Sequence, residues 1–599
     1  MLYQAPKSEF WGEPSKGVAS KDDVALWRQN LINRFPVPFR KHLNSHHKRT
    51  AKRTGYADAN RELNRLYNET LLPGFGVNAS ATDGQIRDYS ETLSARLKRD
   101  FFAMANDDSE KGPKRGFGKR AALEWLKLEL DRRDLELDID TEKTDELISY
   151  LARIFEPDYW VRLLKKRQRY IMEQVARLIR MVNVYSSPYC SDWTLDNRRS
   201  QKSRNKRILE GLEAVSEDGE AVNLWDCVQS SVANPELRRM ELMTRMRGFE
   251  DVAGMVAHVS MFYTVTTPSK YHCHLSKANV QNPKYQGATP REAQDYLTKL
   301  WAKFRAKLHR NGIVVYGFRV AEPHHDGTPH WHLLLFMRPE DQAFVTSELR
   351  EYTLAEDREE VRGCEKVRFE AVEIDPEKGS ATGYIAKYIA KNIDGAHVGI
   401  DDETGDDALS SAERVDAWAS CWGIRQFQQI GGPSVTVWRE LRRLSEDEVS
   451  EMVADNDYVN RGGFSESPVQ RFLADKADEE SKRIEKLWNA ADNADWAAFC
   501  LFQGGPTMPR HKHFLKLWKN QLDEEGNPLE NRFGEVIQTI QGLKIAMVGI
   551  GSRSVKWAIR AVRSAATSEA QASPWSTVNN CTGPPDKELI RLDLGREMG

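Results

Sequence analysis

The amino-acid sequence predicts an α+β protein in which mainly helical regions flank a central antiparallel sheet. Three observations support this fold class. At 599 residues the chain is too long for a single hydrophobic core. Strand and helix patterns alternate between residues 251 and 395, and the sequence on either side is largely polar and helical in pattern. We therefore expect four regions, which are a mainly helical N-terminal region (1–155), a basic helical region (156–250), a central domain (251–445) and a mainly helical C-terminal region (446–599).

The central domain contains strands and helices in a recognisable order. Thr289 and Glu292 form a capping box, with Pro290 at the first helical position, and so mark the start of a helix that ends at Asn311-Gly312. Alternating β-branched and aromatic residues predict strands at 258–268, 313–322, 330–337 and 365–375. Further helices open at Pro339 and span 381–395. The order β-α-β-β-α-β followed by a helix is the ferredoxin-like, or split βαβ, arrangement.

The flanking regions contain local clusters of positive charge. The formal net charge is only -2, so any nucleic-acid surface must be local. Lys and Arg are dense in three segments, residues 40–53, 162–169 and 198–207. Each segment can be a solvated helix face or part of a DNA-binding surface. Deleting these segments and measuring salt-dependent affinity for DNA separates the two interpretations.

Composition restricts the class of protein and its compartment. The charged content is 29%, the hydrophobic content is 40% and the mean hydropathy is -0.63, as in a globular protein of the aqueous phase. No apolar run approaches the roughly 20 residues of a membrane helix, and the first residues lack the pattern of a secretory signal. We expect a cytoplasmic protein. Its seven cysteines are scattered without a CxxC pair, which argues against disulfides and a zinc ribbon.

Two histidines one residue apart raise the possibility of a metal site. In the predicted strand HWHLLLFM, His330 and His332 point to one face while Trp331 points to the other. A short turn at residues 325–329 brings Glu322 of the preceding strand beside His330. Two imidazoles and one carboxylate suit a divalent ion and leave positions for water or substrate. The alternatives are two plain polar positions, or His324 or His325 in place of Glu322. We expect most of the neighbouring histidines, including His272 and His274, to be surface residues.

The helix at residues 381–395 adds candidate nucleophiles. At about 100° per residue, Tyr384, Lys387, Tyr388 and Lys391 share one face, opposite a face of isoleucines and alanines. Tyrosine, with an ordinary pKa of about 10, needs an activated electrophile and cationic neighbours to act as a nucleophile. A divalent ion can polarise a phosphodiester, and the lysines can neutralise charge on the phosphorane or leaving oxygen. The simpler alternative is an amphipathic helix with packed tyrosines and extended lysines.

These motifs resemble a known family. HWH resembles the paired histidines of the HUH endonucleases, YIAKYIAK resembles their two-tyrosine element, and FYTVTTP (residues 262–268) resembles the preceding strand motif of rolling-circle initiators. The sequence is most similar to the replication gene A proteins of tailed bacteriophages. The resemblance implies Mg²⁺ or Mn²⁺ held by His330 and His332, with Glu322 as third ligand. It also implies alternating attack by Tyr384 and Tyr388, a 5'-phosphotyrosine, and a free 3'-hydroxyl for rolling-circle synthesis.

The resemblance also implies partners and leaves alternatives. We expect single-stranded or locally melted origin DNA as substrate in a bacterial host cell. Because there is no GxxxxGK[ST] motif, host helicase and polymerase would act with the protein. The alternatives are a plasmid relaxase, a single-strand transposase, a metallohydrolase without a covalent intermediate, and a DNA-binding scaffold. The aromatic segment 418–441 can stack on unpaired bases, but core packing is the simpler role of its tryptophans.

Overall fold

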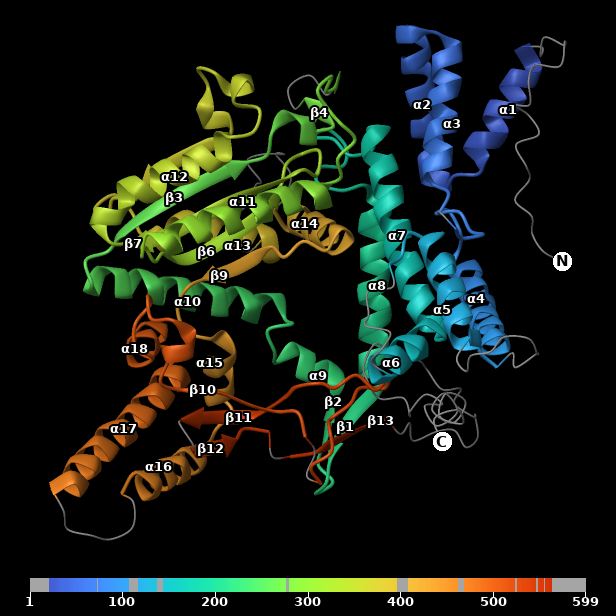
Figure 1. The fold of residues 1–599 in the computed structure, drawn as a ribbon. Helices are drawn as coiled ribbons and strands as arrows, with labels where there is room; N and C mark the ends of the chain where they lie inside the picture. Colours follow the sequence, from blue (N-terminus) through green and yellow to red (C-terminus); the bar gives the residue numbers. More distant parts are fainter. Residues whose placement is uncertain are drawn as a thin grey trace. The chain divides into compact units, whose positions relative to one another are not determined.

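A computed structural model describes residues 21–72, 74–106, 117–136, 144–275, 280–395, 408–461, 468–522, 525–545, 548–553 and 555–562 (Figure 1). These residues form two compact units. Residues 21–181 and 525–537 belong to the first unit, and residues 182–522 and 538–562 belong to the second. The structure is mostly helical with several small antiparallel sheets, so the expected α+β class is confirmed.

The first unit is built from helices. They are α1 (Lys21–Asn33), α2 (Val37–Thr54), α3 (Tyr56–Glu69), α4 (Asp83–Ala105), α5 (Phe117–Asp131), α6 (Thr144–Ile154) and α7 (Pro157–Leu178). α4 packs against α5 and α7 around a core that contains Leu97, Phe101 and Trp160. The basic segments 40–53 and 162–169 lie within α2 and α7 of this unit.

A late segment of the chain completes the first unit. The Phe533 side chain lies in its hydrophobic core. The guanidinium groups of Arg153 and Arg532 lie over the Phe533 ring, 5.8 and 4.6 Å from its centroid. Arg153 also forms an ion pair with Glu535, and Arg532 with Glu156 at 3.5 Å. Residues 525–537 therefore belong to the same core as helices more than 350 residues earlier in the sequence.

A five-stranded sheet is the centre of the second unit. Its strands are β3 (Val259–Thr266), β6 (Tyr316–Pro323), β7 (Pro329–Met337), β8 (Phe369–Glu373) and β9 (Phe427–Ile430). Their order is β8-β3-β7-β6-β9, and every neighbouring pair is antiparallel. α11 (Pro290–Arg310) joins β3 to β6, α12 (Gln342–Leu354) lies between β7 and β8, and α13 (Ala381–Ile393) follows β8. The structure also confirms the Thr289–Glu292 capping box.

The predicted strands and helices are present, with two differences. The strand expected at 365–375 is shorter, because Glu365–Val367 forms a 3-10 turn before β8. The edge strand β9 was not predicted as a strand. It pairs with β6 and so places the segment that follows α14 (Ala408–Trp422) in the same sheet.

The two faces of β7 are covered by different helices. The Trp331 indole Nε1 donates a hydrogen bond to Gln294 Oε1 of α11 at 3.0 Å. On the same face, the Tyr263 hydroxyl lies 2.8 Å from Thr346 Oγ1 of α12. On the opposite face, Leu334 and Phe336 pack in one core with residues of α10 (Pro235–Met255) and α13. The paired histidines occupy this second face, because side chains alternate along a strand.

α10 corrects the expected boundary between the basic helical region and the central domain. The boundary at 250/251 falls inside this helix. Met246, Phe249 and Val252 of α10 are buried against the sheet, and the Phe249 ring contacts Tyr316 and Phe318 of β6. Frequent arginines between these apolar positions obscure the buried stripe in the sequence. α10 therefore belongs to the structural support of the sheet.

The C-terminal region is only partly helical, which corrects a second expectation. α16 (Glu446–Arg461), α17 (Pro468–Asp492) and α18 (Trp496–Phe502) are followed by β10 (Lys516–Asn520), β11 (Thr539–Ile545) and β12 (Val548–Gly551), which form one sheet. β13 (Trp557–Ala561) pairs with β1 (Leu212–Ser216), which also pairs with β2 (Ala221–Asn223). These strands are only three to seven residues long, so their alternation is weak in the sequence.

The remaining elements complete the second unit. They are α8 (Asp192–Glu210), which contains the basic segment 198–207, α9 (Leu224–Gln229), α15 (Val435–Leu441), β4 (His274–Leu275) and β5 (Val280–Gln281). Trp418, Trp422 and Trp438 are almost completely buried, so core packing, and not base stacking, is confirmed for these tryptophans. Among the described residues, each helix is too short or too polar to span a bilayer.

Candidate active site

Glu322, His330 and His332 meet on the face of the sheet that carries α13. β6 and β7 pair so that Glu322 lies opposite His330 and Val320 lies opposite His332. The Nε2 atoms of the two histidines are 3.0 Å apart. Glu322 Oε2 lies 3.7 Å from His332 Nε2 and 4.0 Å from His330 Nε2. All three side chains are buried. Among the described residues, they form a group whose ligand atoms lie close enough together to hold a metal ion.

The donor atoms suit a divalent metal ion. Bonds of about 2.0–2.2 Å from a metal to nitrogen or oxygen place neighbouring ligand atoms about 3.0–3.4 Å apart, so small side-chain shifts are sufficient. Burial lowers the pKa of His332 to about 3 and the pKa of His330 well below its usual value, which leaves both rings uncharged at neutral pH. Thr264 Oγ1 lies 3.2 Å from His332 Nδ1. With the proton on Nδ1, the Nε2 of His332 keeps a lone pair for a metal.

Residues of α13 contact the carboxylate of this cluster. The Asn392 side-chain amide donates a hydrogen bond to Glu322 Oε1. Lys391 Nζ lies 4.0 Å from Glu322 Oε2 and 5.4 Å from the centroid of the Tyr189 ring. Lys391 is therefore buried, although the helical pattern placed it on the same face as the exposed Lys387. Asn392 was not among the predicted site residues, and only its place in the YIAKYIAKN segment pointed to it.

The two tyrosines of α13 lie at different distances from the cluster. The Tyr388 ring stacks on the His332 ring, with centroids 4.0 Å apart and an interplanar angle of 30°. Tyr388 also stacks on Phe262 at 5.5 Å. Tyr384 lies one helical turn earlier, 6.2 Å from Phe262 by ring centroids, and is 45% exposed. The structure thus brings the two predicted halves of the site together, with Tyr388 against a candidate metal ligand and Tyr384 towards solvent.

Contacts in its first turn hold α13 in place. The Ser380 side chain accepts a hydrogen bond from the Gly383 N–H and caps the helix. The Glu250 carboxylate of α10 accepts hydrogen bonds from the N–H groups of Ala381 at 2.7 Å and Thr382 at 3.1 Å. It also accepts one from Thr382 Oγ1 at 2.5 Å. Negative charge at a helix N-terminus is stabilising, so Glu250 ties the tyrosine helix to α10.

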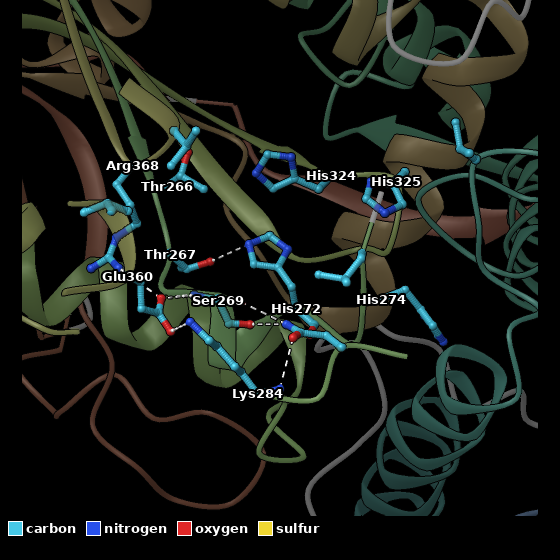
Figure 2. A pocket seen from close by; sticks show the side chains of 15 residues that line it. Thr266, Thr267, Ser269, His272, His274, Lys284, His324, His325, Glu360 and Arg368 are labelled. Carbon is cyan, nitrogen blue, oxygen red and sulfur yellow. Dashed lines mark hydrogen bonds and ion pairs between the residues drawn. The ribbon is translucent and has the colours of Figure 1, made fainter. Parts of the chain in front are cut away.

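A cavity of about 630 Å³ lies next to the cluster and is lined by histidines (Figure 2). The His324 ring stacks on the His330 ring, with centroids 4.1 Å apart. His272 and His325 also line the cavity, and His274 is 3% exposed. The expectation that most of these histidines lie on the surface is therefore wrong. They are enclosed because the Asp326 carboxylate, itself fully buried, accepts hydrogen bonds from the N–H groups of Cys273 and Thr328 and draws two loops together.

A hydrogen bond from α14 also holds the turn between β6 and β7. The Trp418 indole Nε1 of α14 donates a hydrogen bond to the Gly327 carbonyl at 2.7 Å. Gly327 has a φ of +80°, a left-handed conformation that favours glycine. This contact fixes the turn between the strand of Glu322 and the strand of His330.

The fold and the site define an α+β protein with a candidate metal centre on an antiparallel sheet and two tyrosines on the helix beside it. Residues 121–396 match the family described as Bacteriophage replication gene A protein. The chain belongs to this family of bacteriophage replication gene A proteins and replication endonucleases.

Individual relatives support the same assignment. The chain is similar to the replication gene A protein of Escherichia phage 186, with 40% identity over 471 residues, which is 76% of this chain and 62% of the relative. It is 36% identical over 446 residues to the probable replication protein P12 of Pseudoalteromonas phage PM2, covering 74% of this chain and 63% of the relative. It is 34% identical over 537 residues to a probable replication endonuclease from a prophage-like region of Salmonella paratyphi A, covering 86% of this chain and 64% of the relative.

The chain thus spans somewhat less than two thirds of the length of these relatives. No solved structure matches the chain.

Proposed function

We propose that the protein nicks and joins DNA at a specific site and strand by tyrosine transesterification, and so initiates and terminates rolling-circle replication of phage DNA. The observation that carries this proposal is the stacking of Tyr388 on His332 at 4.0 Å, which sets a phenol beside a candidate metal ligand. The replication proteins among its relatives support the choice of DNA as substrate. The substrate would be single-stranded or locally melted origin DNA.

Glu322, His330 and His332 would hold Mg²⁺ or Mn²⁺ in this site. When bound, a divalent ion polarises a non-bridging oxygen of the scissile phosphodiester and makes its phosphorus more electrophilic. Asn392 and Lys391 of α13 would orient the Glu322 carboxylate towards the ion.

The tyrosines would supply the nucleophile. A phenol oxygen loses its proton and bonds to phosphorus, while the bond from phosphorus to the 3'-oxygen breaks. The departing 3'-oxygen takes up a proton and becomes the free 3'-hydroxyl, and the 5' end stays attached as a phosphotyrosine. Lys387, exposed on the helix between the two tyrosines, would neutralise charge on the phosphorane or on the leaving oxygen.

Two tyrosines permit two successive reactions. Tyr384 and Tyr388 are one helical turn apart, so one phenol can hold the 5' end while the other attacks a second phosphate. Because each step exchanges one phosphoester for another, the strand can be rejoined without ATP. Strand separation and synthesis would then fall to a helicase and a polymerase of the bacterial host.

The arrangement of the sheet supports a ferredoxin-like assignment for the nuclease domain, in the manner of the HUH endonucleases. The four strands β8-β3-β7-β6 are antiparallel, with α11 in the connection from β3 to β6 and α12 in the connection from β7 to β8. This order supports the split βαβ pattern that we propose for the domain. The cavity beside His330 would receive the nucleotide that flanks the scissile phosphate.

Covalent capture tests the proposal. The protein is incubated with Mg²⁺ or Mn²⁺ and labelled single-stranded origin DNA, and the adduct is detected on a denaturing gel and assigned by mass spectrometry. We expect an adduct on Tyr384 or Tyr388 that is lost in the Tyr384→Phe/Tyr388→Phe variant. Tyr56→Phe is the matched control, because Tyr56 is 70% exposed and belongs to α3 of the first unit.

An adduct that persists in the double variant contradicts the proposal. Cleavage with turnover but without protein-linked DNA would instead indicate a metallohydrolase. Comparing phage-origin, plasmid-transfer-origin and transposon-end substrates separates a replication initiator from a relaxase or a transposase.

A further inference from the structure

A second hollow of the second unit lies at the open edge of the sheet. It has a volume of about 1,100 Å³ and is lined by the C-terminal half of α11, by β9, by the start of α15 and by Arg510. β9 is the terminal strand of the sheet, so its outer edge faces this hollow and not another strand of the sheet (Figure 1). We call this hollow the β9 groove.

The charge of the β9 groove is strongly one-sided. Its described lining contains five arginines and one histidine but no aspartate or glutamate, and the arginines are Arg245, Arg305, Arg310, Arg425 and Arg510. A surface with the average composition of this protein would also carry aspartate or glutamate, because the whole chain has 87 basic and 89 acidic residues.

Among the residues that the structure describes, most of these arginines have no carboxylate partner. Within that part of the chain, Arg245 alone of the five has an ion pair, with Glu241 at 3.2 Å. Arg425 and Arg510 donate hydrogen bonds from Nε to the backbone carbonyls of Phe427 and Gly432. Within the described part of the chain, the side chains of Arg305 and Arg310 form no hydrogen bond or ion pair, and both are exposed. Positive charge thus accumulates in the groove without internal compensation.

The electrostatics around Arg245 agree with this accumulation. Its pKa is lowered to about 10, mainly by burial and in addition by the positive charges of Arg439 and Arg425. The Glu241 carboxylate at 3.2 Å acts in the opposite direction and raises this pKa.

The described lining of the β9 groove contains none of the residues of the candidate metal centre. One end of the groove lies at Phe427, which pairs with Val320 of β6, and the other end lies at residues 313–315, just before β6. Seven residues of extended chain separate this second end from Glu322, which at about 3.3 Å each is about 23 Å along the strand. At about 3.4 Å per base pair, that distance corresponds to about seven base pairs of DNA.

We infer that the β9 groove binds the phosphate backbone of DNA outside the cleaved phosphodiester, within about seven nucleotides of it. Phosphodiesters match the lining because guanidinium groups bind phosphate oxygens through two parallel hydrogen bonds. The preference for DNA over an acidic protein segment rests on the proposed function.

The character of the lining distinguishes backbone binding from other modes. Trp301 and Phe427 are 6% and 8% exposed, so neither offers a face on which bases can stack. Recognition by charge alone is independent of sequence, so the groove would add affinity on any DNA flank.

Equilibrium binding to DNA tests the inference. The full chain carries Tyr384→Phe/Tyr388→Phe so that DNA is not cleaved, and fluorescence anisotropy is measured with a mixed-sequence single strand of about 30 nucleotides and with the corresponding duplex. The groove variant is Arg305→Ala/Arg310→Ala. Lys299→Ala is the matched control, because Lys299 is an exposed cation of the same helix that does not line the groove.

The expected effects follow from counterion release. Each phosphate contact contributes a slope of about -0.7 for single strands or -0.9 for duplex in a plot of log affinity against log salt. Loss of two contacts should make the slope shallower by about 1.4 or 1.8, and should weaken binding about 25- to 60-fold at 0.1 M salt. Lys299→Ala should keep the parental slope. If only one of the two DNAs, single strand or duplex, is bound more weakly by the groove variant, that DNA is the form that the groove binds.

Two results would overturn the inference. One is equal affinity and equal slope for the groove variant and the Lys299→Ala control on both DNAs. The other is an unchanged DNA affinity together with arginine-dependent binding of polyglutamate, which would assign the groove to an acidic protein. Thermal melting checks the fold, and Arg305→Gln/Arg310→Gln replaces the alanine variant if its melting temperature falls.

The outcome does not depend on the tyrosine chemistry. Binding is measured without cleavage, so the β9 groove can be confirmed even if no phosphotyrosine adduct forms. Conversely, if the protein forms the adduct but its groove variant binds DNA normally, the proposed function stands and the inferred role of the β9 groove is rejected.

Discussion

Glu250 offers a direct test of how the tyrosine helix is held. Its carboxylate lies on α10 and accepts hydrogen bonds from two backbone N–H groups and one hydroxyl in the first turn of α13. Glu250→Ala removes these acceptors and the negative charge at the helix N-terminus. Ile385 and Ile389 remain buried against the sheet, so we expect the unit to stay folded while the start of α13 opens more often.

The size of the effect can be worked out from the contacts. A hydrogen bond to a charged group contributes about 1.5–3 kcal/mol, and a charge at a helix terminus about 0.3–1 kcal/mol. The Glu250 site is only partly buried and the freed N–H groups can bond to water, so the contributions are not additive. We expect local opening of α13 to become easier by about 2–3 kcal/mol, with about half of that for Glu250→Gln, which keeps one acceptor oxygen.

Hydrogen exchange followed by mass spectrometry measures this opening. Since about 1.4 kcal/mol corresponds to a factor of ten, amides at 381–393 should exchange about 30- to 150-fold faster in Glu250→Ala. Peptides from β7 provide an internal reference. Asp251→Ala is the matched control, because Asp251 is the neighbouring acid and pairs with Arg247 of its own helix.

Unchanged exchange of α13 in Glu250→Ala would refute the reasoning. So would equal acceleration in α13 and β7, because that pattern reports unfolding of the whole unit.

Three further predictions concern the metal, the sheet and pH. Chelation should abolish adduct formation and Mn²⁺ should restore it, whereas His332→Ala should stay inactive with added metal; restored activity in His332→Ala would exclude His332 as a ligand. Gly317→Ala should lower the melting temperature by several degrees, because a Cβ there would lie 2.0 Å from the Leu334 carbonyl oxygen and the residue has a φ of +146°. Gly254→Ala, where a Cβ meets nothing within 4 Å, should leave the melting temperature unchanged or raise it slightly, and equal effects of the two variants would contradict the steric argument. Burial lowers the pKa of His47 in α2, so as pH falls this histidine takes up a proton in the unfolded chain before it does so in the folded protein. The stability that neutral His47 contributes above about pH 6.5 is therefore lost as the pH falls below that value. Melting at pH 7.5 and 5.5 should therefore differ less in His47→Gln than in the parent.

The sequence predicted the site where local patterns determine the geometry. Alternation along one strand places His330 and His332 on the same face, and a short hairpin turn sets Glu322 opposite His330, as the strand register confirms. Helical periodicity likewise places Tyr384 and Tyr388 on one side of α13. The roles of these residues in catalysis stay a prediction.

Features that depend on contacts distant in sequence were not predictable in the same way. Lys391 shares a helix face with Lys387, yet it is buried because Glu322 and Tyr189 come from other parts of the chain. Glu250 and Asn392 carry no motif, and their partners are apparent only once α10 and α13 are placed against the sheet. The histidines beside Asp326 look like surface residues in the sequence, but they line a cavity because one buried carboxylate gathers their loops.

The return of the chain to its first unit has a consequence for biosynthesis. During translation, helices α1 to α7 leave the ribosome long before Phe533 does. The hydrophobic core of the first unit therefore lacks one aromatic side chain while most of the second unit is synthesised. Domains generally fold in order from the N-terminus. Here the N-terminal unit is completed late, and a stop codon placed between residues 182 and 533 would leave an unfilled hole in its core as well as shortening the second unit.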